Sequence, residues 1–409
     1  MSSVAAFPPT VNIVELIRSQ DVRRAFQFID SHLEQITEEQ IRICSIPAPP
    51  FGEKVRAEYI RKKFVESGLT NAKLDEEGNC LALRRGHSAA PLLVVSAHLD
   101  TVFPAGTDVA VRSEGGKLGA PGISDDSCGL AALVAIINTL EATQTGTEGS
   151  LLFVATVGEE GEGDLRGVRH LLTRGEWANR IDAFLSFDGA GIDRITNCAL
   201  GSRRYRVRLR GTGGHSWGDF GVVNPVHALG RAITKLASYP APKEPRTTFN
   251  VGRIEGGSSI NAIPEEATMD VDLRSASGQE LIKIDDFFRR AMREAAEDEN
   301  AVRRHGGRPL ELKVDLIGDR PSGETPADAP LVKLAWEATK ALGSMPHLDQ
   351  ASTDSNIPIS LKIPAVTLGA GGTGSNLHTL DEWYDPRGRD IGLKRALLVI
   401  LGMVGLQKG

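Results

Sequence analysis

The sequence places acidic and histidine side chains where predicted strands end and where an apolar helix begins. The clearest case is Leu92–Ala97, an apolar run with β-branched residues that predicts a fully buried strand. It leads into His98-Leu99-Asp100, and residues two apart in an extended chain point to the same side. Three later stretches repeat this arrangement, so that the candidate residues are His98, Asp100, Asp125, Asp126, Glu159, Glu160 and Asp188.

These side chains predict a metal centre. Ligand sites in open α/β sheets lie at the carboxyl edge of the strands, which is where these residues are expected. Crowded carboxylates raise one another's pKa, burial adds to that effect, and a pair of divalent cations removes the conflict. The mixture of imidazole and carboxylate ligands suits Zn2+, and Co2+ or Mn2+ also fits. Taken singly, Asp125-Asp126 could cap a helix and Glu159-Glu160 could form a solvated turn, but these alternatives do not explain why all the stretches are acidic.

Strands and helices alternate through most of the chain. Helical spacing marks residues 11–29, 32–44 and 52–67, and apolar runs that predict strands follow at 92–97, 150–157 and 182–187. An apolar C-terminal helix is expected around residues 396–406. This alternation predicts an α/β fold with a mainly parallel sheet and helices on both faces.

From Gly201 the pattern changes to that of an antiparallel sheet. Arginines alternate with Tyr205, Val207 and Leu209, which predicts a strand with one buried and one charged face; binding of phosphate by the arginines is the weaker interpretation. The elements that follow are a helix at 225–238, strands at 247–254 and 266–274, a helix at 279–300 and a strand at 310–317. This β-α-β-β-α-β order is ferredoxin-like. We therefore predict a catalytic domain formed by residues 1–200 and 320–409 and an inserted α+β domain formed by residues 201–319.

The composition is that of an ordinary globular protein. With 409 residues, 41% hydrophobic and 24% charged, the chain is long enough for two domains. A formal net charge of −6 argues against binding to nucleic acid or to an anionic membrane. No secretory signal is expected, because Met1–Gln20 lacks a basic start followed by an apolar stretch. No membrane span is expected, because the longest apolar run is short and interrupted by glycine. The 4 cysteines form no CxxC pair, which favours a cytoplasmic location.

The other motifs in the sequence are weaker evidence for a function. Gly369, Gly371 and Gly374 form a GxGxxG pattern after a predicted strand, but no amphipathic helix follows, so we reject a dinucleotide site. The sequence has no GxSxG, Walker or HExxH motif. Cys128 is expected to be a small residue at a helix start rather than a nucleophile.

The motifs, taken together, resemble those of the two-zinc exopeptidases and deacylases. That family includes peptidase T, carboxypeptidase G, succinyl-diaminopimelate desuccinylase and acetylornithine deacetylase. The motifs that carry the resemblance are, in order, HLDTV, GISDDSCG, TVGEEGEG, FDGAG, GGHSW, GGSSINAIPEEATMDVDLR and NLHTLDEW, and they cover nearly the whole chain. The resemblance implies the same fold, a zinc-binding α/β domain with an inserted ferredoxin-like lid that usually dimerises.

The resemblance also implies two Zn2+ ions per subunit. His98 and Asp188 would hold one ion, Glu160 and His378 would hold the other, and Asp125 would bridge them. Many relatives have DMKG or DDKG where this chain has DDSCG, so a lysine is lost while the ligand is retained.

For catalysis, the resemblance implies that Glu159 is the general acid/base and that Asp100 orients His98. His215, in the inserted domain, resembles the residue that stabilises the oxyanion, often from the partner subunit. Asn261 and Arg274 match positions that contact the substrate, with Arg274 binding its carboxylate.

The residue type at position 188 narrows the range of expected substrates. In this family an aspartate at that position accompanies aminopeptidases and dipeptidases, whereas glutamate accompanies carboxypeptidases and deacylases. We therefore predict a cytoplasmic, homodimeric two-zinc aminopeptidase that hydrolyses di- or tripeptides, as peptidase T does. The alternatives are a deacylase of N-acyl amino acids or a carboxypeptidase with the same metal core, and, more remotely, an inactive binding protein, which the complete set of ligands argues against.

Overall fold

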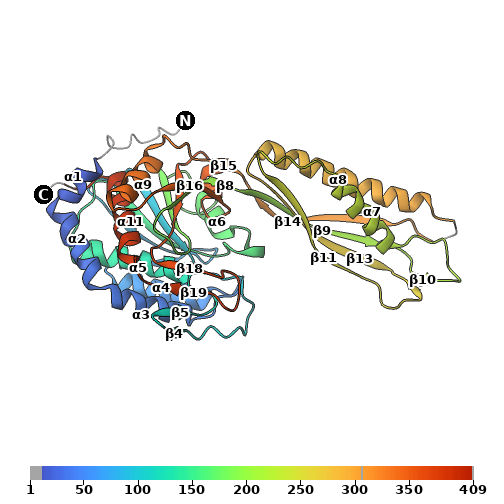
Figure 1. The fold of residues 1–409 in the computed structure, drawn as a ribbon, viewed down its shortest axis with the longest axis horizontal. Helices are drawn as coiled ribbons and strands as arrows, with labels where there is room; N and C mark the ends of the chain where they lie inside the picture. Colours follow the sequence, from blue (N-terminus) through green and yellow to red (C-terminus); the bar gives the residue numbers. More distant parts are fainter. Residues whose placement is uncertain (1–11, 305–306, 408–409) are drawn as a thin grey trace. The chain divides into compact units, whose positions relative to one another are not determined.

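The computed structural model describes residues 12–304 and 307–407. Their contacts divide the chain into two compact units (Figure 1). The first unit comprises Met1–Ala199 and Glu324–Gly409, and the second comprises Leu200–Gly323. The second unit is therefore an insertion in the sequence of the first.

The first unit is built around a nine-stranded sheet, counted over the described residues, in the order β1-β2-β6-β3-β7-β17-β8-β15, with β16 paired to β8. The strands are β1 (Lys73–Leu74), β2 (Cys80–Arg84), β3 (Leu92–His98), β6 (Ser150–Thr156), β7 (Ala183–Phe187), β8 (Arg194–Ala199), β15 (Gly323–Glu324), β16 (His347–Ala351) and β17 (Ala365–Leu368). The central strands β6, β3, β7 and β17 run parallel. Strand β2 pairs antiparallel with β1 and with β6, and β8 pairs antiparallel with β17.

Helices cover both faces of this sheet, because successive side chains of a strand point to opposite faces. In β3, Leu93 and Val95 join one core, whereas Leu92 and Val94 join the other. Against the first face pack α1 (Ile13–Arg18), α2 (Gln20–Ser31), α3 (Leu33–Cys44), α4 (Lys54–Glu66), α5 (Ser127–Ala142), α9 (Pro330–Ala341) and α11 (Arg389–Val404). Against the second face pack α6 (Arg166–Thr173) and α10 (Asn356–Ser360), and a short 3-10 helix spans Gly161–Gly163. The predicted fold class is confirmed.

The N-terminal helical stretch differs from its prediction as one helix over residues 11–29. Ser19 ends α1 with an extended ψ of 146° and caps α2 by accepting the N–H of Val22. Two helices result, and the predicted start at Val11 lies outside the described residues. Over the residues that the structure describes, no helix is both long enough and apolar enough to cross a membrane.

A smaller sheet of the first unit joins distant parts of the chain. Its order is β18-β19-β5-β4, from β4 (Arg112–Glu114), β5 (Lys117–Gly119), β18 (Thr373–Ser375) and β19 (Trp383–Asp385). In this sheet β5 pairs antiparallel with β19. This pairing brings the segment before Asp125 next to the segment after His378.

Over its described residues, the second unit is a four-stranded antiparallel sheet in the order β11-β13-β9-β14, with two helices on one face. Its elements are β9 (Gly201–Arg210), β10 (Gly214–His215), α7 (Pro225–Ala237), β11 (Thr247–Gly256), β12 (Ala262–Ile263), β13 (Glu266–Ser275), α8 (Gly278–Ala301) and β14 (Glu311–Arg320). Tyr205, Val207 and Leu209 lie in the core beneath the helices. On the other face Arg206 pairs with Asp270 at 2.8 Å. The ferredoxin-like order and the charged face are both as predicted.

Candidate metal centre

Three neighbouring parallel strands, β6, β3 and β7, place predicted site residues at one edge of the sheet. His98 is level with Thr156 in the pairing of β3 with β6, and Ser96 is level with Ser186 in the pairing of β3 with β7. The chain therefore leaves all three strands at the same edge. The segments that begin there carry His98 and Asp100, Glu159 and Glu160, and Asp188.

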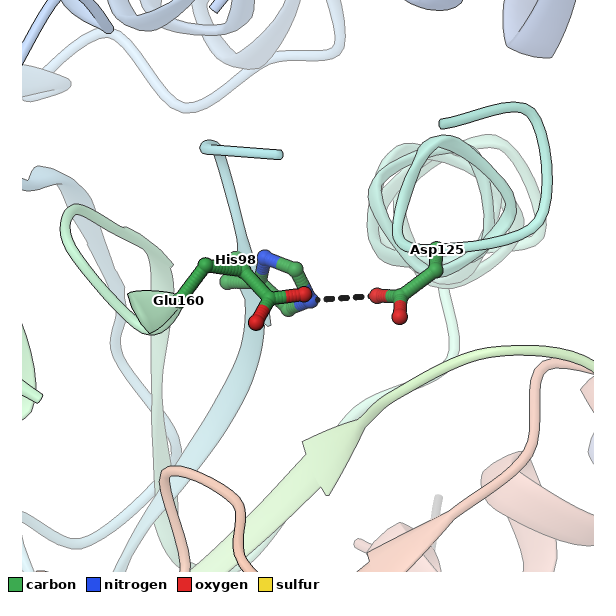
Figure 2. Close-up of side chains that lie close together, drawn as sticks. All are labelled: His98, Asp125 and Glu160. Atoms are coloured by element: carbon green, nitrogen blue, oxygen red, sulfur yellow. Dashed lines mark hydrogen bonds and ion pairs between the residues drawn. The ribbon is translucent and has the colours of Figure 1, made fainter. Parts of the chain in front are cut away.

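His98, Asp125 and Glu160 form a close cluster (Figure 2). One potential ligand atom from each residue lies within 4.8 Å of the others. His98 Nε2 is 2.8 Å from Asp125 Oδ1, and both carboxylates point toward the imidazole. The three side chains are buried, with exposed fractions of 2%, 7% and 8% for His98, Asp125 and Glu160. Three donor atoms thus converge where bulk water is largely excluded.

His378 joins this cluster from a distant part of the chain. Its Nε2 lies 3.0 Å from Glu160 Oε1 and 3.1 Å from Asp125 Oδ2. Its side chain is 53% exposed, so it forms the solvent side of the cluster. Its φ of 63° lies in the left-handed region, which is unfavourable for a residue with a Cβ. The surrounding structure must therefore hold this histidine in place.

Asp100 is fully buried and connects His98 with the glutamate pair. Its backbone carbonyl lies 3.0 Å from His98 Nδ1, and its Oδ1 lies 3.6 Å from the same nitrogen. A hydrogen bond from Nδ1 to a carbonyl leaves Nε2 as the nitrogen that can bind a metal. The Asp100 carboxylate accepts the backbone N–H groups of Glu159 and Glu160 at 2.9 and 2.8 Å. Asp100 thus contacts His98 mainly through its carbonyl, and its carboxylate binds the backbone of Glu159 and Glu160.

Asp188 lies near the cluster, directly after β7. It is not one of the three described residues whose ligand atoms lie within 4.8 Å of one another. Burial and then the negative charge of Asp125 raise the pKa of its carboxyl to about 7. Asp188 therefore lies within electrostatic reach of Asp125, at the His98 edge of the sheet.

Asp126 joins the backbone segments of the centre. Its Oδ2 accepts the N–H of His98 at 3.2 Å, and its Oδ1 accepts the N–H groups of Gly189 and Gly129 at 3.1 Å each. The bond to Gly129 makes Asp126 the N-cap of α5, which is the helix-cap alternative raised from the sequence. The same carboxylate also ties the start of α5 to the residue that follows Asp188. Sequence reasoning grouped Asp126 with the ligands and did not foresee this positioning role.

The ionisable groups of the centre show how strongly negative it is. Burial lowers the pKa of His98, but hydrogen bonds with Asp100 and Asp125 raise it well above the usual value. Hydrogen bonds to Asp125 and Glu160 raise the pKa of His378 to about 10. Burial raises the pKa of the Asp126 carboxyl well above its usual range. All three shifts favour added positive charge, which divalent cations also supply, and the imidazole and carboxylate donors fit such cations.

His215 and Asn261 lie together in the second unit. The β10–β12 pairing sets His215 level with Ala262, and the N–H of Ser216 donates to the carbonyl of Asn261 at 3.0 Å. Both residues are exposed. His215 Nδ1 accepts the N–H groups of Trp217 and Gly218 at 3.2 and 3.3 Å. Because a nitrogen that accepts carries no proton, Nε2 is the donor of the neutral ring.

Arg274 lies on β13 of the four-stranded sheet, at the end away from the β10–β12 ribbon. It is level with Ser202 in the pairing of β13 with β9, and its Nε donates to Asp272 Oδ2 at 2.6 Å. Residue Arg210, at the other end of β9, precedes the β10 ribbon, and eight steps of ~3.3 Å from Ser202 span about 26 Å. Within one inserted unit, the structure does not bring Arg274 together with His215.

Glu382 is a buried residue of the centre that the sequence analysis left without a role. Its carboxylate accepts the backbone N–H groups of Gly122, Ser124 and Asp125 at 2.8, 2.7 and 2.9 Å. It follows His378 by four positions in the motif NLHTLDEW. The available signal was the acidic pair Asp381-Glu382 directly before the aromatic pair Trp383-Tyr384.

A ligand cluster at the carboxyl edge of a mainly parallel sheet, together with an inserted ferredoxin-like unit, defines a two-domain metallopeptidase architecture. The chain belongs to peptidase family M20/M25/M40, whose family model matches residues 94–401. This membership confirms the predicted relationship and the prediction of a hydrolytic enzyme.

Among curated relatives, the chain is similar to the succinyl-diaminopimelate desuccinylase of Corynebacterium glutamicum. The two are 28% identical over 247 residues, which are 59% of this chain and 66% of that protein. The aligned region thus spans just under two thirds of the desuccinylase.

Solved structures of the same fold include several peptidases. The aminopeptidase PepT of Bacillus cereus matches with a TM-score of 0.72 and 20% identity, over 91% of this chain and 98% of that one. A tripeptidase of Staphylococcus aureus matches with a TM-score of 0.74 and 22% identity, over 90% and 97%. A dinuclear metal-binding peptidase of the M20 family from Bacillus subtilis matches with a TM-score of 0.65 and 18% identity, over 92% and 99%. These likenesses establish the fold.

Proposed function

We propose that this protein is a metal-dependent aminopeptidase that hydrolyses the amide bond of di- or tripeptides with a free amino terminus. The observation that carries the proposal is the buried cluster of His98, Asp125 and Glu160, which His378 joins at 3.0 and 3.1 Å. Glu159, the predicted general acid/base, is buried and directly precedes Glu160 in the chain. An inactive binding protein has no need of this combination.

We propose two Zn2+ ions as the cofactor, with Co2+ or Mn2+ as substitutes. His98 and Asp188 hold one ion, Glu160 and His378 hold the other, and Asp125 lies between them. Support comes from the donor types, from the mutual distances and from the dinuclear metal binding named for the Bacillus subtilis peptidase of the same fold. When bound, such cations supply Lewis-acid activation of a water molecule and of the scissile carbonyl.

The remaining catalytic roles belong to side chains of the protein. Glu159 takes a proton from the attacking water and passes it to the leaving amine. Asp100 fixes the backbone of Glu159, which keeps its carboxylate in one place. His215 donates from Nε2 to the oxyanion that forms on the substrate, since its Nδ1 is engaged by backbone N–H groups. Asn261 contacts the substrate, and Arg274 binds its carboxylate.

We further propose that the inserted unit acts as lid and dimerisation domain, that the protein is a homodimer, and that it works in the cytoplasm without nucleic-acid or membrane partners. The net charge of −6 supports the absence of such partners. The four cysteines, all free, support a reducing compartment.

A comparison of free with blocked peptides tests the substrate assignment. The purified, metal-loaded protein is expected to cleave Leu-Gly-Gly and to leave N-acetyl-Leu-Gly-Gly intact, because an aspartate at position 188 goes with a free amino terminus in the resembling enzymes. Release of leucine, followed by chromatography, is the measurement. A preference for the acetylated peptide, or for N-succinylated amino acids, would favour the deacylase alternative to which the desuccinylase relative points.

A further inference from the structure

We propose that Glu382 is a positioning residue that holds the Asp125 loop and the His378 segment together, and that it thereby sets the affinity of the metal ion bound between Glu160 and His378. This inference rests on the proposed metal centre. It adds a residue that contacts neither substrate nor metal and acts through the backbone of a ligand.

The loop that carries Asp125 depends on Glu382 for its N–H groups. The carboxylate accepts from Gly122 with Oε2 and from both Ser124 and Asp125 with Oε1, at 2.7–2.9 Å. Glu382 is 1% exposed, so water cannot replace these bonds. Three donors converging on one buried carboxylate fix the backbone from Gly122 to Asp125.

The carbonyl groups of the same loop are bonded elsewhere. Ser127 Oγ donates to Gly122 O at 2.6 Å, Gln40 Nε2 donates to Ile123 O at 2.6 Å, and Cys128 Sγ donates to Ser124 O at 2.9 Å. The first turn of α5 and α3 thus satisfy the acceptors, while Glu382 satisfies the donors. None of the other contacts can take over the role of the carboxylate, because each uses the opposite polarity.

Glu382 is also part of the segment that carries His378. Its N–H donates to the carbonyl of Thr379 at 3.3 Å, and its carbonyl accepts the N–H of Ala120 at 3.0 Å. Trp383, the next residue, is level with Gly119 in the β19–β5 pairing. One residue therefore fixes the spacing between Asp125 and His378, whose side chains meet at 3.1 Å.

Glutamine in place of Glu382 keeps the shape of the side chain but replaces one acceptor oxygen with an NH2 donor. One oxygen would remain to accept hydrogen bonds, and the amide NH2 would face a backbone N–H. At least one buried N–H would lose its partner, and the loop would shift to recover it. Loss of an outer partner of this kind typically lowers metal affinity by about 10- to 100-fold.

The test is a Zn2+ titration of the metal-free full-length protein, wild type against Glu382→Gln, with circular dichroism to verify folding. The site between Glu160 and His378 is expected to lose about 10- to 100-fold in affinity. The absorption bands of Co2+ bound in its place are also expected to change. Glu299→Gln is the matched control, because Glu299 is a buried glutamate that accepts the N–H of Asn224 at 2.9 Å in the second unit. It should leave both the affinity and the Co2+ spectrum unchanged.

A folded Glu382→Gln protein with wild-type Zn2+ affinity and Co2+ spectrum would overturn this inference and leave the metal centre standing. Should Glu382→Gln fail to fold, Glu382→Asp takes its place, since the shorter side chain retains the charge but cannot reach all three N–H groups. Unchanged affinity in that variant would overturn the inference equally. A wild-type protein that takes up no divalent cation would instead refute the proposed metal centre, and this inference with it.

Discussion

Glu159→Gln is expected to lower kcat by roughly 10²–10⁴ while the protein keeps its full complement of metal. Glutamine has nearly the same shape as glutamate but cannot accept a proton from the attacking water. The backbone of Glu159 remains bonded to Asp100, so the neighbouring Glu160 keeps its position. The measurements are steady-state hydrolysis of a tripeptide and metal analysis of the same preparation.

Glu160→Gln is the matched control one position along the chain. Glu160 Oε1 meets His378 Nε2 at 3.0 Å within the cluster, so this change should weaken binding of the metal and should be partly relieved by excess Zn2+. The two variants therefore separate a base from a ligand. A metal-free Glu159→Gln protein would contradict the assigned roles.

The positions at the strand ends could be predicted because they depend on local sequence. Apolar runs such as Leu92–Ala97 mark buried strands, and parallel strands in a sheet end at a common edge. The polar residue that ends each run must therefore lie near the others. The alternation of Tyr205 and Val207 with arginines is also a local signal. It identified the inserted antiparallel sheet, because apolar residues at every second position mark a strand with one buried face.

The support around the centre could not be predicted, because it depends on pairings between distant segments. Asp126 and Glu382 accept hydrogen bonds from backbone N–H groups up to 260 positions away in the sequence. Such bonds leave no periodic pattern in the sequence. Strands β5 and β19 are three residues each, too short for any pattern to show. Ser19 breaks the first predicted helix by capping the second, and serine is also compatible with a helix interior. Local signals thus located the candidate ligands, and long-range hydrogen bonds position the segments that carry them.

The geometry of the inserted unit bears on how its residues reach a substrate. Arg274 and the ribbon that carries His215 lie at opposite ends of one sheet, about 26 Å apart along β9 at ~3.3 Å per residue. A di- or tripeptide spans roughly 10 Å at that rise. If both residues contact the same peptide, they must come from different subunits, which is how the resembling enzymes often use the histidine.

Mixed dimers of two inactive variants are therefore expected to regain activity. His215→Ala should lower kcat by about 10²–10³, the usual effect of losing one oxyanion donor, and Glu159→Gln is inactive for lack of a base. After joint unfolding and refolding, random pairing across one two-fold interface makes about half of the dimers mixed. One of the two sites in each mixed dimer combines the base of the His215→Ala chain with the histidine of the Glu159→Gln chain. Activity per subunit should return to roughly a quarter of wild type.

Each variant refolded alone serves as the control, with size-exclusion chromatography to show that dimers form. If His215 served its own chain, both sites of a mixed dimer would lack one group and the mixture would stay as inactive as its parents. The exposed position of His215 makes this a clean test, because its replacement removes no core contact. The backbone N–H groups of Trp217 and Gly218 hold the acceptor Nδ1 of His215, which leaves Nε2 to donate to the oxyanion in this test.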